Sequence, residues 1–309
     1  MKYFSAFFIV GLITCGVMVS CKDSNSQKNG PVEETLTSGS ITLFTDNTIQ
    51  PIVEDVLAVF HNVYDKANIK QVNMTEQEIL QAMMKDSAAI AVFPRMLTKE
   101  EERHFVKKDV KPRVTPFAVD AVALITNEKA TDTVMNLEEV LKVLQGKTSD
   151  KIKTLVFDNS GSSTVQYLLK LAGVKTPPAS GVYALKTNEE VIKYVYNNNG
   201  AIGIVGVNWL VQPPGSLTQY IDKIAVLGID NVKIDRGQKK YYKPNQSSIA
   251  DGSYPLTRKL YVLNYQGKKG LGMGFATYIS AREGQRIILK SGLLPLDIPT
   301  REIAVRNAL

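Results

Sequence analysis

The sequence is short of the side chains on which most hydrolases and metal sites depend. It has two cysteines, two histidines and one tryptophan among 309 residues. His61 and His104 fall in segments with a helical, surface-lying pattern, and the sequence contains no Gly-x-Ser-x-Gly elbow. No cysteine or histidine spacing fits a metal site, and no serine has an evident base beside it. We therefore expect no enzyme, no cofactor and no metal.

A strong excess of one charge sign is also absent. The formal net charge of +7 comes from scattered lysines and arginines, without a stripe that combines basic and aromatic residues. Nucleic acid is therefore not an expected partner. A mildly basic chain is compatible with an anionic ligand or with a membrane surface, but this charge alone favours neither of them.

Long apolar runs are limited to the N-terminus. Residues 3–19 are almost uncharged and follow Met1-Lys2, but this run is too short and wrongly flanked for a spanning helix. The sequence Met18-Val19-Ser20-Cys21 is similar to a bacterial lipobox. It predicts a signal peptide over residues 1–20 and lipidation of Cys21, which would anchor the chain to a membrane of the cell envelope. The alternative is a secreted protein that is cleaved nearby and carries no lipid.

Beyond this segment, residues 21–40 are rich in Ser, Asn, Lys, Glu and Gly, and we expect a flexible tether there. The remaining ~270 residues exceed one ordinary core and suggest two lobes. Strand-like and helix-like patterns alternate, which predicts an α/β fold. The principal expected strands are 41–44, 88–93, 117–127, 153–157, 199–206 and 260–265. The principal expected helices are 51–64, 75–85, 98–105, 137–144, 165–172, 188–198 and 274–290.

Two polar turns stand between a strand and a helix. The turn at residues 160–164 holds four hydroxyls and a glycine, and the turn at residues 45–48 reads Thr-Asp-Asn-Thr. Free N–H groups at a helix N-terminus favour an anion. The alternative is simple capping, by Ser162 or Ser163 in one turn and by Asp46 in the other.

An ordered set of segments resembles the PstS-like phosphate-binding proteins, which are the periplasmic subunits of bacterial phosphate ABC transporters. The segments are 117–127 (FAVDAVALITN), 137–140 (LEEV), 146–147 (GK), 160–162 (SGS), 200–207 (GAIGIVGV), 252–261 (GSYPLTRKLY), 283–285 (EGQ) and 292–296 (GLLPL). The resemblance covers roughly residues 41–296. No single motif decides it, and the order of the set carries the resemblance.

The resemblance implies a type II clamshell with lobe I at residues 41–118 and 256–309 and lobe II at residues 119–255. Hinge strands would cross near residues 118–124 and 253–261, and the lobes would close on a ligand. The implied function is a monomeric, lipid-anchored solute-binding protein that delivers phosphate or a related oxyanion to a membrane ABC permease. The implied anion-binding residues are Asn47, Thr48, Arg95, Asp120, Ser160, Gly161, Ser162, Ser163 and Thr164.

The sequence departs from this family at three places. Val156 stands where the family usually has an arginine, the first turn lacks the usual Gly-Ser-Thr-Thr, and Arg95 follows Phe93-Pro94 rather than two serines. Asp46 would repel an anion unless the ligand donates a proton, as phosphate can and sulfate cannot at neutral pH.

Several of these residues also have a purely structural alternative. Arg95 is either a ligand residue or a surface residue, Asp120 either faces the cleft or bonds the hinge backbone, and the same choice applies to Arg258. The departures therefore keep a second function open, in which the chain is a degenerate binding-protein fold with a structural or interaction role.

Overall fold

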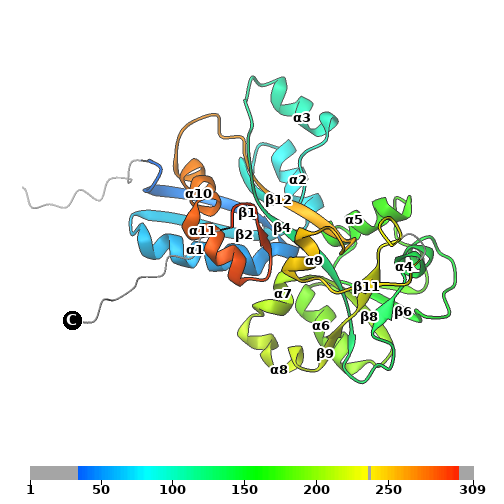
Figure 1. Cartoon of the computed structure of the whole chain (residues 1–309). Helices are drawn as coiled ribbons and strands as arrows, with labels where there is room; N and C mark the ends of the chain where they lie inside the picture. Colours follow the sequence, from blue (N-terminus) through cyan, green and yellow to red (C-terminus); the bar gives the residue numbers. More distant parts are fainter. Residues whose placement is uncertain (1–33, 236–237, 299–309) are drawn as a thin grey trace, which may run out of the picture. The chain divides into compact units, whose positions relative to one another are not determined.

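The computed structural model describes residues 34–235 and 238–298, and strands alternate with helices through most of this part (Figure 1). The expected signal peptide and Cys21 lie outside the described residues. The main helices are α1 (Gln50–Val63), α2 (Glu76–Met84), α3 (Lys99–Val106), α4 (Leu137–Leu144), α5 (Ser163–Ala172), α6 (Asn188–Asn197), α10 (Leu271–Ser280) and α11 (Arg282–Lys290). Short helices are η1 (Asn47–Ile49), α7 (Asn208–Val211), η2 (Gly215–Leu217), α8 (Thr218–Ile221) and α9 (Gln246–Ala250).

The strands of the main sheet follow the order β2-β1-β3-β12-β4-β8-β6-β7, with β9 and β13 also pairing with β4. Their bounds are β1 (Gly39–Asp46), β2 (Ala67–Met74), β3 (Ile90–Phe93), β4 (Arg113–Asn127), β6 (Thr154–Phe157), β7 (Val182–Ala184), β8 (Ala201–Gly206), β9 (Ile224–Val226), β12 (Thr257–Asn264) and β13 (Leu294–Pro295). A small second sheet contains β11 (Tyr241–Tyr242), β10 (Gly228–Asp230) and β5 (Val134–Met135). The predicted α/β class is confirmed.

Strand β4 connects the two halves of the sheet. Residues 113–121 of β4 pair antiparallel with β12, and residues 122–125 pair antiparallel with β8. A second connection runs beside it, because Val122 N donates to Leu256 O at 2.9 Å and the Tyr254 hydroxyl donates to Val122 O at 2.6 Å. The point where β4 passes from β12 to β8, at residues 121–122, and the second connection at residues 254–256 fall within the predicted crossings, and they give the two-lobed arrangement expected from sequence.

Each half has its own helical cover. In the half that contains β1, helices α1, α10 and α11 lie together (Figure 1), and the Phe60 ring lies 5.9 Å from Phe275 and 5.1 Å from Tyr278. In the other half, α6 packs on β8 and β4 through Val191, Ile192 and Val195, which are fully buried. Burial of these apolar faces stabilises the layers that support the two turns.

The single helix expected at residues 274–290 is wrong. The structure has two helices that separate at Ala281, whose backbone is extended. Gly284 then lies so close to the end of α10 that a Cβ atom would come within 2.5 Å of Ile279 O. Apolar positions continue from the first of these helices into the second, so the hydrophobic pattern of the sequence did not reveal the break at Ala281. The strands also extend beyond prediction: β1 begins at Gly39, β4 at Arg113 and β12 at Thr257.

No helix within residues 34–235 and 238–298 combines the length and the apolar character needed to cross a membrane.

Candidate functional site

The first polar turn is formed where β1 ends and η1 begins. Asp46 accepts a hydrogen bond from Thr48 N at 2.9 Å and another from the Thr48 hydroxyl. The cap interpretation of Asp46 is therefore confirmed. Asn47 is the first residue of η1 and is half-buried, whereas Thr45, Asp46 and Thr48 are fully buried.

The second polar turn follows β6 and opens α5. Ser162 is the N-cap, with its hydroxyl accepting from Val165 N at 3.5 Å, as the capping alternative predicts. The Ser162 and Thr164 hydroxyls lie 3.0 Å apart, and Thr164 donates to Asp158 at 3.4 Å. Ser160 is exposed. Of the four hydroxyls in this turn, the one on Ser163 is directed toward the first turn.

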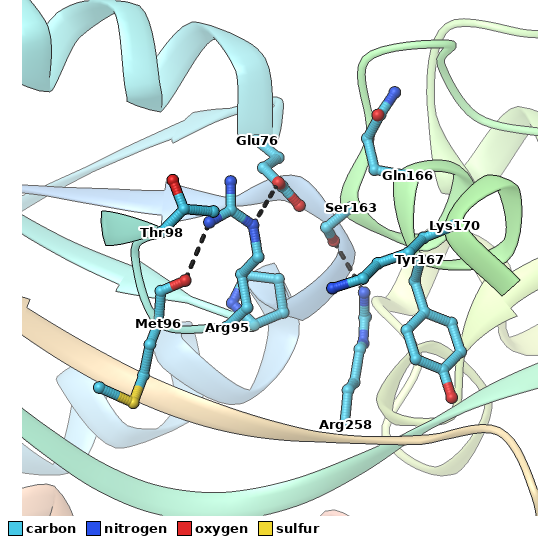
Figure 2. A pocket seen from close by; sticks show the side chains of 10 residues that line it. Glu76, Arg95, Met96, Thr98, Ser163, Gln166, Tyr167, Lys170 and Arg258 are labelled. Carbon is cyan, nitrogen blue, oxygen red and sulfur yellow. Dashed lines mark hydrogen bonds and ion pairs between the residues drawn. The ribbon is translucent and has the colours of Figure 1, made fainter. Parts of the chain in front are cut away.

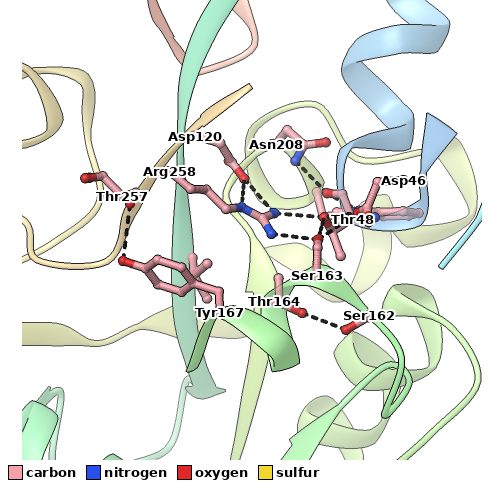
Figure 3. A network of polar contacts seen from close by, with 12 residues as sticks. Asp46, Thr48, Asp120, Ser162, Ser163, Thr164, Tyr167, Asn208, Thr257 and Arg258 are labelled. Carbon is pink, nitrogen blue, oxygen red and sulfur yellow. Dashed lines mark hydrogen bonds and ion pairs between the residues drawn. The ribbon is translucent and has the colours of Figure 1, made fainter. Parts of the chain in front are cut away.

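The two turns meet directly, although they are more than 100 residues apart in sequence. The Ser163 hydroxyl lies 2.9 Å from the Thr48 hydroxyl and donates to Asp46 Oδ1 at 2.8 Å (Figure 3). Nearby, Gln77 N donates to Gly161 O at 3.4 Å. The structure thus brings together Thr48 and Ser163 from the expected set, and adds Asp46.

Arg258 on β12 joins both turns to the connecting strands. Its Nη1 donates to the Ser163 hydroxyl and its Nη2 donates to the Thr48 hydroxyl, each at 2.8 Å (Figure 3). Its Nε and Nη2 also donate to Asp120 Oδ2 at 2.9 and 2.8 Å. Arg258 and Asp120 are register partners on β12 and β4, and both are buried. Asp46, Thr48, Asp120, Ser163 and Arg258 are called the inner cluster below.

The electrostatics of the inner cluster are dominated by burial. Burial raises the pKa of Asp46 and of Asp120, while Arg258 opposes the rise in both. Among the described residues, Asp46 Oδ2, Asp120 Oδ1 and Thr45 Oγ1 are buried acceptors without a hydrogen-bond partner. Asp46 Oδ2 and Asp120 Oδ1 are therefore buried carboxylate oxygens with unused acceptor capacity, and neither residue lines the cavity described below.

Residues that sequence reasoning missed hold the first turn in place. Asn208 Nδ2 and Trp209 Nε1 donate to Thr48 O at 2.9 and 3.1 Å. Gly206 allows this approach, because a Cβ atom there would lie 2.7 Å from Thr48 O. The only sequence signal for this contact was Gly206, which stands in the glycine-rich segment 200–207 (GAIGIVGV).

A cavity of about 410 Å³ opens beside the inner cluster, with Ser163 and Arg258 in its wall (Figure 2). The opposite wall carries Arg95, which donates to Glu76 at 2.7 Å and to both carboxylate oxygens of Glu101 at 2.9 and 3.0 Å. Glu76 itself lines the cavity, together with Pro94, Met96, Thr98, Gln166, Tyr167 and Lys170. The structure therefore places Arg95 at the cavity but away from the two turns.

A model of the PBP superfamily domain matches residues 30–283. The chain belongs to the PBP superfamily. This membership agrees with the fold. Strand β4 and a second connection join two halves, and the polar turns of these halves meet beside a cavity.

Named relatives and solved structures extend this result. The phosphate-binding protein PstS of Pseudomonas aeruginosa is 21% identical over 295 residues, which is 87% of each chain. That of Borreliella burgdorferi is 20% identical over 306 residues, or 93% of this chain and 96% of the relative. A phosphate ABC transporter substrate-binding protein with bound phosphate from Clostridium perfringens superposes with a TM-score of 0.68 at 17% identity, over 84% of this chain and all of that chain. An ABC-type phosphate transport receptor from Vibrio cholerae gives 0.62 at 16% identity, over 83% and 100%. The structural likeness establishes the shared fold.

Proposed function

We propose that this chain is the solute-binding protein of an ABC transporter and that it captures phosphate between its two halves. The observation that carries the proposal is Arg258, a buried cation that donates to one hydroxyl from each polar turn. Relatives that cover most of the chain are named as phosphate-binding proteins, which supports a binding role rather than catalysis.

The inner cluster has the chemistry that a buried oxyanion requires. A desolvated anion is costly unless its oxygens receive hydrogen bonds. Arg258 supplies positive charge at the wall of the cavity, where the Ser163 hydroxyl also lies, and its second Nη1 proton is not used in these contacts. In this proposal Arg258 replaces the arginine that the family carries at the position of Val156, so the cation comes from β12 instead of β6.

The acidic side chains favour phosphate over sulfate. At neutral pH phosphate retains a proton, which it can donate to a carboxylate oxygen such as the unpartnered Asp46 Oδ2. Sulfate has no such proton and would meet Asp46 and Asp120 as an acceptor only. We infer that the protein discriminates between these two anions through the missing proton.

The wider role follows from the same assignment. Lobe I would comprise residues 41–118 and 256–309, and lobe II residues 119–255, with closure around the ligand presenting a surface to a membrane permease. The monomeric chain would be held at the cell envelope through lipidated Cys21.

Calorimetric titration of the purified protein with phosphate, and with sulfate as control, tests the proposal. We expect heat with phosphate and a rise in melting temperature, because a ligand that binds the native state stabilises it. Heat with sulfate alone, or with neither anion, would contradict it.

One observation favours the second candidate function, a structural or interaction lipoprotein. Thr48 N and the hydroxyls of Thr48 and Ser163 all donate to Asp46 Oδ1, so a protein carboxylate already uses donors that an anion would need. If the titration shows no binding of either anion, this internal carboxylate provides the physical reason and the second candidate is preferred.

A further inference from the structure

The cavity beside the inner cluster is larger than inorganic phosphate requires. It measures about 410 Å³, whereas the five non-hydrogen atoms of phosphate occupy on the order of 100–150 Å³ if each takes about the volume of a water molecule. The two halves already touch at Thr48 and Ser163 and at Gln77 and Gly161. The surplus space is therefore present while the two turns are in contact.

The walls of the surplus space suit a short organic group. Met96 lies on one side and the ring of Tyr167 on the other (Figure 2), and Pro94 also lines the cavity. The Tyr167 hydroxyl donates to Thr257 O at 3.2 Å, so its polar end is occupied and its ring offers an apolar face. Such a mixture of apolar walls and a few fixed polar groups is typical of sites for small organic ligands.

Lys170, whose side chain is exposed, adds a third positive charge to the cavity wall, after Arg258 and Arg95. Figure 2 shows its side chain extending across the cavity in the direction of Arg258. Within the described part of the chain, no acidic side chain forms a salt bridge with Lys170, whereas Arg95 is bonded to Glu76 and Glu101. An ammonium group at a cavity wall without a carboxylate partner can pair with a second acidic group on a ligand.

We propose that the site takes a small phosphate monoester that carries a carboxylate, and that inorganic phosphate is the truncated form of this ligand. The phosphoryl group would lie at Arg258 and Ser163, the carbon chain beside Tyr167 and Met96, and the carboxylate at Lys170. This proposal rests on the proposed function, because it uses the same anion site and adds the organic part.

Calorimetry on the full chain with three probes tests the inference. The probes are inorganic phosphate, glycerol 3-phosphate and 3-phosphoglycerate. We expect 3-phosphoglycerate to bind at least tenfold more tightly than phosphate, with glycerol 3-phosphate between them. Phosphate binding as tightly as either ester, or more tightly, would overturn this inference and leave the proposed function intact. Absence of binding by all three would overturn both.

A pair of lysine variants tests the assigned position of the carboxylate. Lys170→Ala should weaken binding of 3-phosphoglycerate about tenfold more than binding of glycerol 3-phosphate, since only the former carries the second charge. Lys175→Ala is the matched control, because Lys175 is exposed just beyond α5 and does not line the cavity. An equal loss for both esters, or the same loss in Lys175→Ala, would overturn the assignment of Lys170.

Discussion

Two arginines face the same cavity in opposite environments. Arg258 is buried, with 4% of its side chain exposed, and bonds to Asp120 and to both polar turns. Arg95 is 31% exposed and bonds to Glu76 and Glu101, which lie on its own side of the cavity. The comparison shows that Arg95, which the resemblance implied as an anion-binding residue, lies at the rim of the cavity, whereas Arg258 links the two halves.

The difference has an energetic consequence. A charge removed from water must keep its partner, while a partly exposed pair can exchange its partner for water. We therefore expect the inner cluster to control both stability and binding. The rim of the cavity, formed by Arg95 with Glu76 and Glu101, should contribute much less.

The largest expected effect is on stability, from Arg258→Met. It leaves Asp120 buried without its cation and should lower the free energy of unfolding by about 3–5 kcal/mol, measured by urea denaturation. The matched variant Arg95→Met should lose only about 1–2 kcal/mol.

A double variant sharpens this prediction. Arg258→Met combined with Asp120→Leu removes the directly bonded pair and should recover part of the lost stability, because one unpaired buried charge is removed while Asp46 still lacks its cation. Equal losses in the Arg258→Met and Arg95→Met proteins would show that the burial difference does not govern stability.

The next effect concerns pH and Asp158, which lies behind the second turn. Burial raises its pKa from 3.8 to about 6. A carboxyl group with a raised native pKa favours the fold at low pH, and this contribution is lost as the pH rises through 6. Relative to Asp158→Asn, the wild-type protein should lose roughly 2 kcal/mol of stability between pH 4 and pH 7. Denaturation series at several pH values measure it, and a constant difference between the two proteins would refute it.

The pKa of Glu101, at the rim of the cavity, is shifted in the opposite direction to the pKa of Asp158. Burial raises the pKa of Glu101, but the hydrogen bonds from Arg95 and Thr98 outweigh it, so the net pKa is lowered. Any stability that Glu101 contributes is therefore present above its unfolded pKa and lost as the pH falls through its lowered native value.

A smaller loss is expected from Gly206→Ala. The added methyl group would meet Thr48 O and the Asn208 amide, so it should cost roughly 1–3 kcal/mol by overpacking. Gly215→Ala serves as the control, because a Cβ atom at Gly215 meets nothing within 4 Å. Thermal melts that show the same shift for both glycines would contradict the close approach.

The smallest effect is expected at the N-terminus of α3. Thr98 and Glu101 form a capping box there, and Glu101 also bonds to Arg95. Thr98→Ala should lower stability by about 1 kcal/mol and should leave phosphate affinity within twofold of the wild-type value. A large loss of phosphate binding in this variant would place the rim, not the inner cluster, at the centre of recognition.

Local sequence signals predicted both turns and most of the main helices, but they missed strand β2 (Ala67–Met74) and the break between α10 and α11. Helix 137–144 was correct to the residue, and the helix expected at 75–85 is α2, whose N-cap Thr75 forms a capping box with Glu78. Such features depend on neighbours within a few residues, which is why one sequence suffices to find them.

The sequence could not reveal how distant residues combine. Arg258 reaches Asp120 because β12 and β4 pair in one register, and it reaches Thr48 across 210 residues. The structural alternatives for Asp120 and Arg258 stayed open because strand order is a property of the whole sheet. Likewise, Ser162 and Ser163 look alike in sequence, yet one caps α5 and the other contacts Asp46.

Phosphate titration of two lysine variants by calorimetry tests the central claim most directly. Arg258→Lys keeps the charge but loses the planar donor set that reaches both turns, so it should weaken phosphate binding at least tenfold. Arg95→Lys should remain within about threefold of wild type. The opposite ranking, or equal losses, would contradict the account.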